Sequence, residues 1–217
     1  MKQTKLSAAT PDRSRGRPVD TSQQDLKARI LDTATQLFTD LGYAATSIRN
    51  IADHAGVNPA LVHYYFGSKH SLLEVVLQHS LEPMVSALAS LKTNESASVE
   101  DIAALLIRTA AAHPNIPRLL TREVLLPGGE MQAFFIENLA PQLGGALPGL
   151  VERERNAGKL REDTDPAYAA LMILAMCFFP FIARSLAEPV FGIDLGSKGA
   201  DTLTQHVSEL LKRGFMT

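Results

Sequence analysis

Three polar side chains in succession, His63, Tyr64 and Tyr65, place an imidazole and two phenols within one short segment of the chain. On an exposed helix, such groups can hydrogen-bond to the base edges and phosphate oxygens of a nucleic acid. Phe66 follows directly, and because consecutive helical residues point in different directions, we expect it to pack in the core. This stretch therefore favours recognition of a nucleic acid over catalysis.

The elements that must position these side chains are two short helices joined by a tight turn. An apolar stripe at helical spacing predicts the first helix and consists of Ile48, Ile51, Ala52 and Ala55. Gly56 can adopt the positive φ at which a helix ends, Asn58 can cap the second helix, and Pro59 suits its first position. Gly67 then ends this helix and Ser68 caps the next one. This geometry is the one that places a second helix in a DNA major groove.

The basic charge of the chain is concentrated beside this motif, although the formal net charge of the 217 residues is −2. Residues 1–73 carry nine Lys or Arg against six Asp, a net charge of +3. Residues 74–217 carry twelve Lys or Arg against seventeen Asp or Glu, a net charge of −5. The asymmetry has the sign that phosphate neutralisation requires. The length allows one large or two small domains with a buried core.

Little in the sequence supports an enzyme or a bound cofactor. The six His residues are scattered without metal-ligand spacing, and no glycine-rich phosphate loop follows a strand. Cys177 is the single cysteine, which excludes an internal disulfide and suits a reducing cytoplasm. Because it stands in an apolar helix, we expect a buried structural thiol rather than a nucleophile. We therefore expect no catalytic residues, no metal and no cofactor.

Residues 166–183 are uncharged and mostly apolar, so they raise the question of a membrane span. The stretch is short for the roughly 20 residues that cross a bilayer, and it contains Tyr168 and Pro180. A helix buried on most sides explains it better. The first residues lack the apolar core of a signal peptide. We therefore expect a soluble, cytoplasmic protein without membrane contact.

Helical periodicity extends over the rest of the chain, and no alternating pattern indicates a strand. Beside the two short helices, we expect helices near residues 24–40, 68–91, 97–112, 115–126, 129–157, 166–187 and 198–213. Pro83 is expected to kink the second of these or end it early, and Pro141, Pro148 and the glycines between them to break the fifth.

The predicted fold class is all-α, with a three-helix head on a larger helical body. Its expected divisions are a flexible basic arm at 1–22, a helix-turn-helix DNA-binding domain at 23–73 and a helical ligand-binding and dimerisation domain at 74–217. The arm is assigned from its polar, charged composition, which is rich in Ser, Thr and Pro.

Three motifs between residues 25 and 73 are specific in combination: LFTDLGYAATS, then IRNIADHAGV, then LVHYYF followed by GSK. With the Ala-Gly-Val turn and the spacing from Phe66 to Lys69, they resemble the DNA-binding head of TetR-family transcriptional regulators. The body shows only a general likeness. Its stretches HPNIPRLLTREVLLPGG and GKLREDTDPAYAALMI are similar to ligand-binding domains of a TetR subgroup.

The resemblance also implies which residues meet DNA. The positions that match DNA-facing residues of the family are Thr46, Ser47, Arg49, Pro59, Ala60, His63, Tyr64, Tyr65 and Lys69. Thr46 and Ser47 match contacts to the sugar-phosphate chain, and Lys69 matches a phosphate contact. Arg49 matches a residue that reaches a base or a phosphate, and its alternative is a solvated face.

On the second helix of the motif, the chain departs from the family at His63, where Tyr is usual. This substitution keeps a side chain able to donate a hydrogen bond and leaves the base preference open. Pro59 and Ala60 can touch thymine methyl groups but cannot make bidentate hydrogen bonds to bases. We therefore expect sequence reading to rest on few contacts together with DNA shape.

Ahead of the head, Arg15 and Arg17 flank a glycine and precede Pro18. Two guanidiniums around a glycine can lie in a narrow A·T-rich minor groove, where the negative potential is high. The alternative is a basic tail that meets only solvent. The place of the arm before a helix-turn-helix head is what supports the groove contact.

For the body, the resemblance implies a two-fold dimer formed by the last two long helices, expected at 166–187 and 198–213. Their apolar residues exceed what one amphipathic stripe needs, although central helices of a monomeric core would show the same excess. The candidates to line an effector pocket are Arg122, Phe134, Phe135, Met172, Met176 and Phe179. Met and Phe at helical spacing also suit a plain core. Arg122 needs a partner, which we expect to be Glu123, Glu137 or an anionic group of a ligand.

The expected function is that of a ligand-responsive DNA-binding repressor. It would act as a homodimer on a palindromic operator and be released by a small apolar or amphipathic effector. The alternative is a constitutive or architectural helical DNA-binding protein with no small-molecule ligand. The expected partners are therefore double-stranded DNA, a small-molecule effector and a second copy of the chain.

Overall fold

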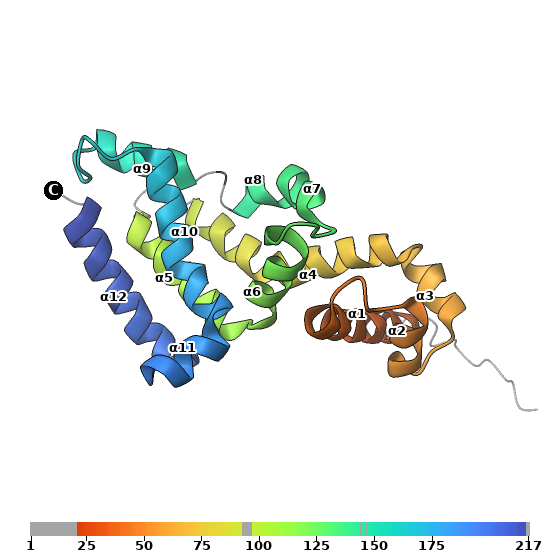
Figure 1. Ribbon diagram of the computed structural model, residues 1–217. Coiled ribbons are helices and arrows are strands. Elements are labelled where there is room, and N and C mark those ends of the chain that lie inside the picture. The colour runs from red at the N-terminus through yellow and green to blue at the C-terminus, as the bar shows by residue number, and fades with distance from the viewer. Residues whose placement is uncertain (1–20, 93–96, 144, 146, 216–217) are drawn as a thin grey trace, which may run out of the picture.

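The computed structural model describes residues 21–92, 97–143, 145 and 147–215. Across these ranges the regular elements are helices, which confirms the predicted all-α fold. Figure 1 shows a small head formed by α1, α2 and α3 and a larger body formed by the helices from α5 onward, with α4 running between them. Arg15 and Arg17 of the predicted arm lie outside the described residues.

The head is built from α1 (Thr21–Leu41), α2 (Ile48–Ala55) and α3 (Pro59–Phe66). Its core comes from the apolar stripes predicted for these helices, and the buried side chains include Ile30, Phe38, Ile51, Val62 and Phe66. Each large apolar side chain that is fully buried contributes roughly 1.5–3 kcal/mol. This packing fixes the orientation of α2 and α3, whose polar side chains remain at the surface.

Helix α4 (Lys69–Lys92) joins the head to the body as one continuous element. It continues through Pro83 to Lys92, which agrees with the helix predicted at 68–91 and excludes the alternative of an early end at this proline. A proline in a helix interior costs about 3 kcal/mol. Packing on both sides of it offsets this cost, because Leu81 is buried before Pro83 and Met84 and Leu88 are buried after it. At 1.5 Å per residue, α4 is a rod about 36 Å long.

The body contains the remaining elements, two of which are π-helical segments named η1 and η2. They are α5 (Val99–Ala112), α6 (Asn115–Leu120), η1 (Thr121–Leu125), α7 (Gln132–Phe134), η2 (Phe135–Leu139), α8 (Ala140–Leu143), α9 (Leu147–Asn156), α10 (Pro166–Ile182), α11 (Arg184–Phe191) and α12 (Ser197–Phe215). The helix predicted at 129–157 is interrupted between α8 and α9, in the region where glycines and prolines were expected to break it. The helix predicted at 166–187 is also divided, because α11 is bent by 78° from α10.

Helix α5 lies at the centre of the body and packs against α4, α9, α10 and α12. Its inward side chains include Ala103, Leu106 and Ile107, all of them buried. Cys177 of α10 is buried against this helix, and its thiol donates to the Ala103 carbonyl oxygen at 3.7 Å. Burial raises the pKa of the Cys177 thiol to about 12. The thiolate is therefore suppressed at neutral pH, as expected for a structural cysteine.

Helix α10 carries the apolar stretch that raised the question of a membrane span. Its side chains at Ile173, Cys177 and Phe181 are buried within the chain. Taken one at a time, the helices of the described ranges are too short or too polar to cross a membrane, and only the bent pair of α10 and α11 together reaches the required length and composition.

Candidate nucleic-acid interface and ligand cavity

The two short helices of the head are capped at the residues that the sequence indicates. The side chain of Asn58 accepts a hydrogen bond from the Ala60 amide at 2.8 Å, with Pro59 at the first helical position. Gly56 has a φ of 63°, the left-handed conformation that a residue with a side chain adopts at a cost. In addition, Ser47 caps α2 by accepting from the Asn50 amide at 3.1 Å. These caps confirm the predicted helix-turn-helix.

Most of the predicted DNA-facing side chains lie exposed on this motif. Six of them are exposed, namely Ser47, Arg49, Pro59, Ala60, His63 and Tyr64, and Tyr65 is half-buried. The side chain of Arg49 is 87% exposed, and it forms a long ion pair with Asp53 at 3.9 Å. Phe66 is buried, which confirms its predicted place in the core. On α3, His63 lies one turn after Pro59 and Tyr64 lies one turn after Ala60, so the two members of each pair point to the same side of the helix.

Thr46 is an exception, because only 1% of it is exposed. Its hydroxyl donates to the Gly42 carbonyl oxygen at 2.8 Å inside the turn between α1 and α2. The hydroxyl is therefore used within the head and does not face a phosphate. The family match placed Thr46 at the DNA surface, and the difference arises because a threonine beside a helix end readily bonds a nearby carbonyl.

Lys69 also has partners within the head. Its ammonium group donates to the carbonyl oxygens of Tyr43 at 2.9 Å and Thr46 at 3.0 Å. The same group lies 3.8 Å from the ring centroid of Tyr43, a cation–π distance. An ammonium has three N–H donors, so at most one is left for a phosphate. Lys69 thus holds the turn before α2 in place.

The basic charge of the N-terminal third of the chain is distributed unevenly along the sequence. Residues 21–73 carry four Lys or Arg and four Asp, whereas residues 1–20 carry five Lys or Arg and two Asp. The whole basic excess of the N-terminal third therefore belongs to the first 20 residues. Any general attraction to phosphate depends mainly on them.

A joint between head and body lies at the end of α1. The guanidinium of Arg122 in η1 donates to the carbonyl oxygens of Thr39 at 3.1 Å and Asp40 at 2.8 Å. The adjacent Glu123 is buried and accepts from the Tyr43 amide at 2.9 Å. A cation at a helix C-terminus is stabilised by the helix dipole and by unpaired carbonyls. The partners of Arg122 within the chain are therefore main-chain carbonyls of α1, and not Glu123 or Glu137, the two carboxylates that the sequence offered.

Gly42 is required at this joint for two reasons. Its φ is 86°, in the left-handed region that favours glycine. A Cβ atom at this position would also lie 2.9 Å from Nε of Arg122. The absence of a side chain thus lets the body approach the end of α1.

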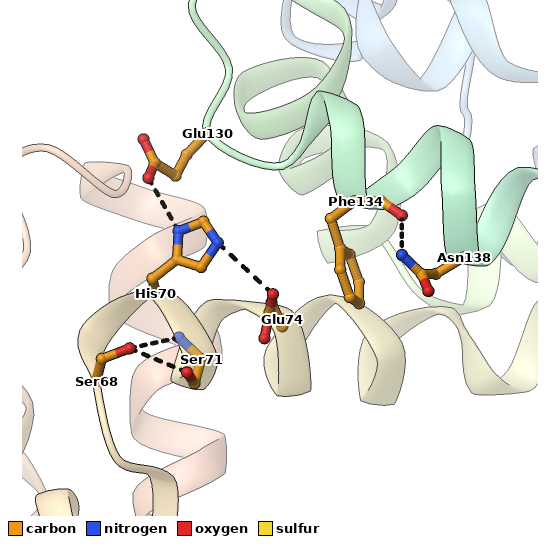
Figure 2. A network of polar contacts seen from close by, with 7 residues as sticks. All are labelled: Ser68, His70, Ser71, Glu74, Glu130, Phe134 and Asn138. Atoms are coloured by element: carbon orange, nitrogen blue, oxygen red, sulfur yellow. Dashed lines mark hydrogen bonds and ion pairs between the residues drawn. The ribbon is translucent and has the colours of Figure 1, made fainter.

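A second link joins the start of α4 to the loop before α7, as Figure 2 shows. His70 has Nδ1 at 2.9 Å from a carboxylate oxygen of Glu130 and Nε2 at 3.6 Å from Glu74. Beside it, the Ser71 amide donates to the Ser68 hydroxyl at 3.0 Å, which confirms the predicted cap. In the same view the ring of Phe134 points from α7 toward α4. Phe134 therefore packs between α7 and α4.

A cavity of about 240 Å³ lies in the body between α4, α5, α8, α9 and α10. Among the residues that the structure describes, its lining is apolar except for Arg153 and consists of Leu88, Ala97, Ile102, Leu106, Leu143, Leu147, Gly149, Leu150, Arg153 and Leu174. Arg153 is exposed and donates to the Ala97 carbonyl oxygen at 2.9 Å. The cavity can thus hold a small apolar group with a guanidinium at its edge.

None of the six residues predicted to bind a ligand lines this cavity, and all six are among those that the structure describes. Arg122 belongs to the joint, while Phe134, Phe135 and Met176 are half-buried against the core. Met172 and Phe179 lie on the opposite, exposed side of α10. The lining leucines had no signal in the sequence that distinguished them from other core leucines.

Helix α10 also presents a stripe of apolar side chains that the described part of the chain leaves exposed. Its large members are Tyr168, Leu171, Met172 and Phe179, all at least 46% exposed. Helix α11 adds Leu186, Val190 and Phe191, and α12 adds Leu210. Only some apolar residues of the two helices predicted for the dimer contact are at the surface. Ile173, Phe181 and Val207 are instead buried within the chain itself. Exposed apolar stripes of this kind are typical of surfaces that contact another molecule.

Comparison with known families gives matches over most of the chain. The sequence-family model described as "Bacterial regulatory proteins, tetR family" matches residues 30–76. The model described as "Tetracyclin repressor-like, C-terminal domain" matches residues 96–214, more than half of the chain. The chain belongs to the TetR family. It is a TetR-family transcriptional regulator with the helix-turn-helix head and helical body described above.

Relatives of this TetR-family chain are regulators. It is 30% identical over 193 residues to the HTH-type transcriptional repressor NicS of Pseudomonas putida, covering 85% of this chain and 90% of NicS. The ketosteroid transcriptional regulator KstR2 of Mycobacterium tuberculosis has a TM-score of 0.69 at 17% identity, covering 92% of this chain and 97% of KstR2. FadR from Bacillus subtilis, solved in complex with stearoyl-CoA, has a TM-score of 0.66 at 20% identity, covering 85% and 96%. At these identities the two structures show a shared fold.

Proposed function

We propose that this TetR-family chain is a ligand-responsive transcriptional repressor. It binds a palindromic operator as a homodimer, and a small apolar or amphipathic effector releases it. The observation that carries the proposal is the capped α2–turn–α3 unit, which presents exposed polar side chains on a short second helix. A repressor among the relatives, NicS, supports the direction of the response.

The DNA contacts that we propose for the head follow from the exposure of its described side chains. Ser47 and Arg49 at the start of α2 meet the sugar-phosphate chain, while His63, Tyr64 and Tyr65 on α3 reach base edges or phosphates. Pro59 and Ala60 provide apolar contact to thymine methyl groups. Arg15 and Arg17 follow the minor groove. Lys69 acts mainly by holding the α1–α2 turn, and Thr46 is not included because it is buried.

The exposed apolar stripe of α10 is the surface that we propose for the homodimer. Pairing this stripe with its copy about a two-fold axis removes apolar surface from water on both chains. Replacing Phe179 by Glu, at a side chain 65% exposed, should convert the dimer to monomers in sedimentation experiments and weaken operator binding. Ile136→Glu is the matched control, because Ile136 is 60% exposed on η2, away from the stripe. A dimer that tolerates Phe179→Glu contradicts the proposed surface.

The cavity is the site that we propose for the effector. Its apolar lining favours a compact apolar molecule, and the Arg153 guanidinium at its edge favours an anionic group such as a carboxylate. Its volume of about 240 Å³ falls just below the usual range of ligand pockets, roughly 300–1,000 Å³. The effector class that fits is therefore a small aliphatic or aromatic acid.

Helix α4 supplies the mechanical connection between cavity and head. Leu88, near one end of α4, lines the cavity, and Lys69, at the other end, holds the turn before α2. These two residues are 19 positions apart, a distance of about 28 Å along the helix axis. A ligand that displaces the cavity end of this rod changes the separation of the two heads of a dimer, and it releases DNA if it prefers that state.

The experiment that tests the proposal begins with selection of binding sites from random duplex DNA by the full chain. A palindromic site that small carboxylates release, while the matching amides do not, supports the repressor. Arg153→Leu should reduce sensitivity to carboxylates about tenfold or more, with operator affinity unchanged. Arg155→Leu is the matched control, because Arg155 on the same helix does not line the cavity. Binding that no acid alters favours the constitutive DNA-binding protein, and failure to select any site contradicts the proposal.

A further inference from the structure

His63 is held in one tautomer by the chain itself. Its Nδ1 lies 2.7 Å from the carbonyl oxygen of Gly67, the residue that ends α3. A carbonyl oxygen can only accept a hydrogen bond, so Nδ1 must carry the proton. In the neutral imidazole the other nitrogen, Nε2, then has a lone pair and no proton. The sequence predicted that this side chain can donate a hydrogen bond to DNA. In neutral His63, the nitrogen that is free to meet DNA is instead an acceptor.

The position of His63 brings this acceptor to the proposed DNA surface. The residue is exposed, and it lies one helical turn after Pro59 and Ala60 on α3. A second hydrogen bond, from the Gly67 amide to the His63 carbonyl at 2.8 Å, closes the same turn of chain. The two bonds fix the ring relative to the helix end, so Nε2 faces away from it.

We propose that His63 is a specificity-determining residue that accepts a hydrogen bond at Nε2 from an exocyclic amino group in the major groove. The proposal rests on the proposed DNA-binding function. Adenine N6 and cytosine N4 are the donors that the major groove offers, whereas guanine presents only the acceptors N7 and O6. The base that His63 contacts in each half-site is therefore adenine or cytosine, and the Gly67 carbonyl is the positioning group that makes Nε2 an acceptor.

The first test concerns the free protein and does not involve DNA. Nitrogen-15 spectra of the histidine side chains at pH 8, where a solvated imidazole is mostly neutral, distinguish a protonated from an unprotonated ring nitrogen. We expect a protonated Nδ1 and an unprotonated Nε2 for His63. The reverse tautomer would overturn the proposal whatever the protein binds.

The second test uses the operator selected by the full chain. Each adenine in a half-site is replaced by purine and each cytosine by pyrimidin-2-one, which removes one amino group at a time. At one position we expect the affinity of the wild type to fall by about 5- to 150-fold. His63→Ala should lose this sensitivity at that position and keep the wild-type response at the others.

His54→Ala is the matched control for the removal of a local hydrogen bond. His54 on α2 has its Nδ1 at 2.8 Å from the Asn50 carbonyl oxygen, the same kind of contact that His63 makes. This variant should respond to each base analogue as the wild type does. Each guanine is also replaced by 7-deazaguanine, which removes the N7 acceptor. If no adenine or cytosine analogue distinguishes His63→Ala from the wild type, or if only 7-deazaguanine does so, His63 does not read an amino group. Selection that yields no operator would instead overturn the proposed function, and the base contact with it.

Discussion

The ammonium of Lys69 stands 3.8 Å from the ring centroid of Tyr43 and also donates to the main-chain carbonyl of the same residue. One side chain at the start of α4 thus holds both the ring and the backbone of the turn that leads into α2. Because Ser47 and Arg49 follow this turn directly, their placement depends on Lys69.

We therefore expect Lys69→Met to act first on stability. Removing the hydrogen bonds of a charged, half-buried group should lower the free energy of unfolding by roughly 1–3 kcal/mol, measured by urea denaturation. DNA affinity should fall by a similar factor on every sequence, because the turn supports backbone contacts and not base contacts. Arg49→Met is the control: it should weaken DNA binding with a change in stability below about 0.5 kcal/mol. Equal stability of Lys69→Met and the wild type would show that the turn holds without Lys69.

The joint at the end of α1 predicts a contrast between two arginines. Arg122→Met removes two charge-assisted hydrogen bonds to α1 carbonyls and should cost roughly 1–3 kcal/mol of unfolding free energy. Arg118→Met removes an ion pair to Asp40 in which both side chains are more than a third exposed, so it should cost about 1 kcal/mol or less. Thermal and urea unfolding of the two variants measure this difference. Similar costs for both would contradict the assignment of Arg122 to the joint.

Removal of the first residues tests the electrostatic part of DNA binding. Residues 1–19 contain Lys2, Lys5, Arg13, Arg15 and Arg17, all the basic residues of the first twenty. Their deletion should weaken operator binding and flatten its salt dependence, by up to about 0.9 in slope for each phosphate that is no longer neutralised. The pair Arg15→Ala with Arg17→Ala should reduce the preference for A·T-rich flanks, whereas Lys2→Ala with Lys5→Ala should not. An unchanged affinity and slope after deletion would exclude the arm from the complex.

A pH-dependent stability effect is expected at the start of α5. Hydrogen bonds from the Ser98 amide and hydroxyl lower the pKa of Asp101 below its ordinary value of 3.8. A lowered pKa in the folded state stabilises the protein above the ordinary pKa, and this contribution is lost as the pH falls through the lower folded value. Ser98→Ala should therefore cost roughly 0.5–2 kcal/mol at pH 7, with the difference from the wild type shrinking below about pH 4.

For comparison, Asp163→Asn removes an ion pair with Arg161 at the protein surface. This variant should leave the free energy of unfolding nearly unchanged at neutral pH, since exposed pairs contribute little. A cost for Ser98→Ala that stays constant down to pH 2 would show that Asp101 takes no part in the cap.

The parts of the structure that could be predicted are those decided by near neighbours in the sequence. The caps at Asn58 and Ser68 and the turn at Gly56 depend on residues within three positions, and all were predicted. The bounds of α2 and α3 follow from apolar spacing and from glycine and proline in the same way, whereas the bend between α10 and α11 was not predicted. The family resemblance added the expected DNA-facing surface of the head, which exposure supports for residues such as Arg49 and Tyr64.

The parts that could not be predicted depend on contacts between distant segments. Lys69 and Arg122 both bond to main-chain carbonyls, and a carbonyl has no sequence signal because every residue has one. The side of α10 that faces the cavity could not be predicted either. Met172 and Phe179 are exposed, whereas Leu174 lines the cavity.

Two side chains of the body bond to backbone atoms at the end of α1: Arg122 donates to carbonyl oxygens, and Glu123 accepts from an amide. The exposed Arg118–Asp40 pair is the side-chain contact beside them. The hydrogen bonds of Arg122 and Glu123 do not depend on which side chains the end of α1 carries. Any DNA-binding head whose first helix ends in a left-handed glycine offers the same backbone carbonyls and amide. A chimera that carries another such head on this body should therefore dock correctly, so DNA specificity can be exchanged without redesign of the sensor.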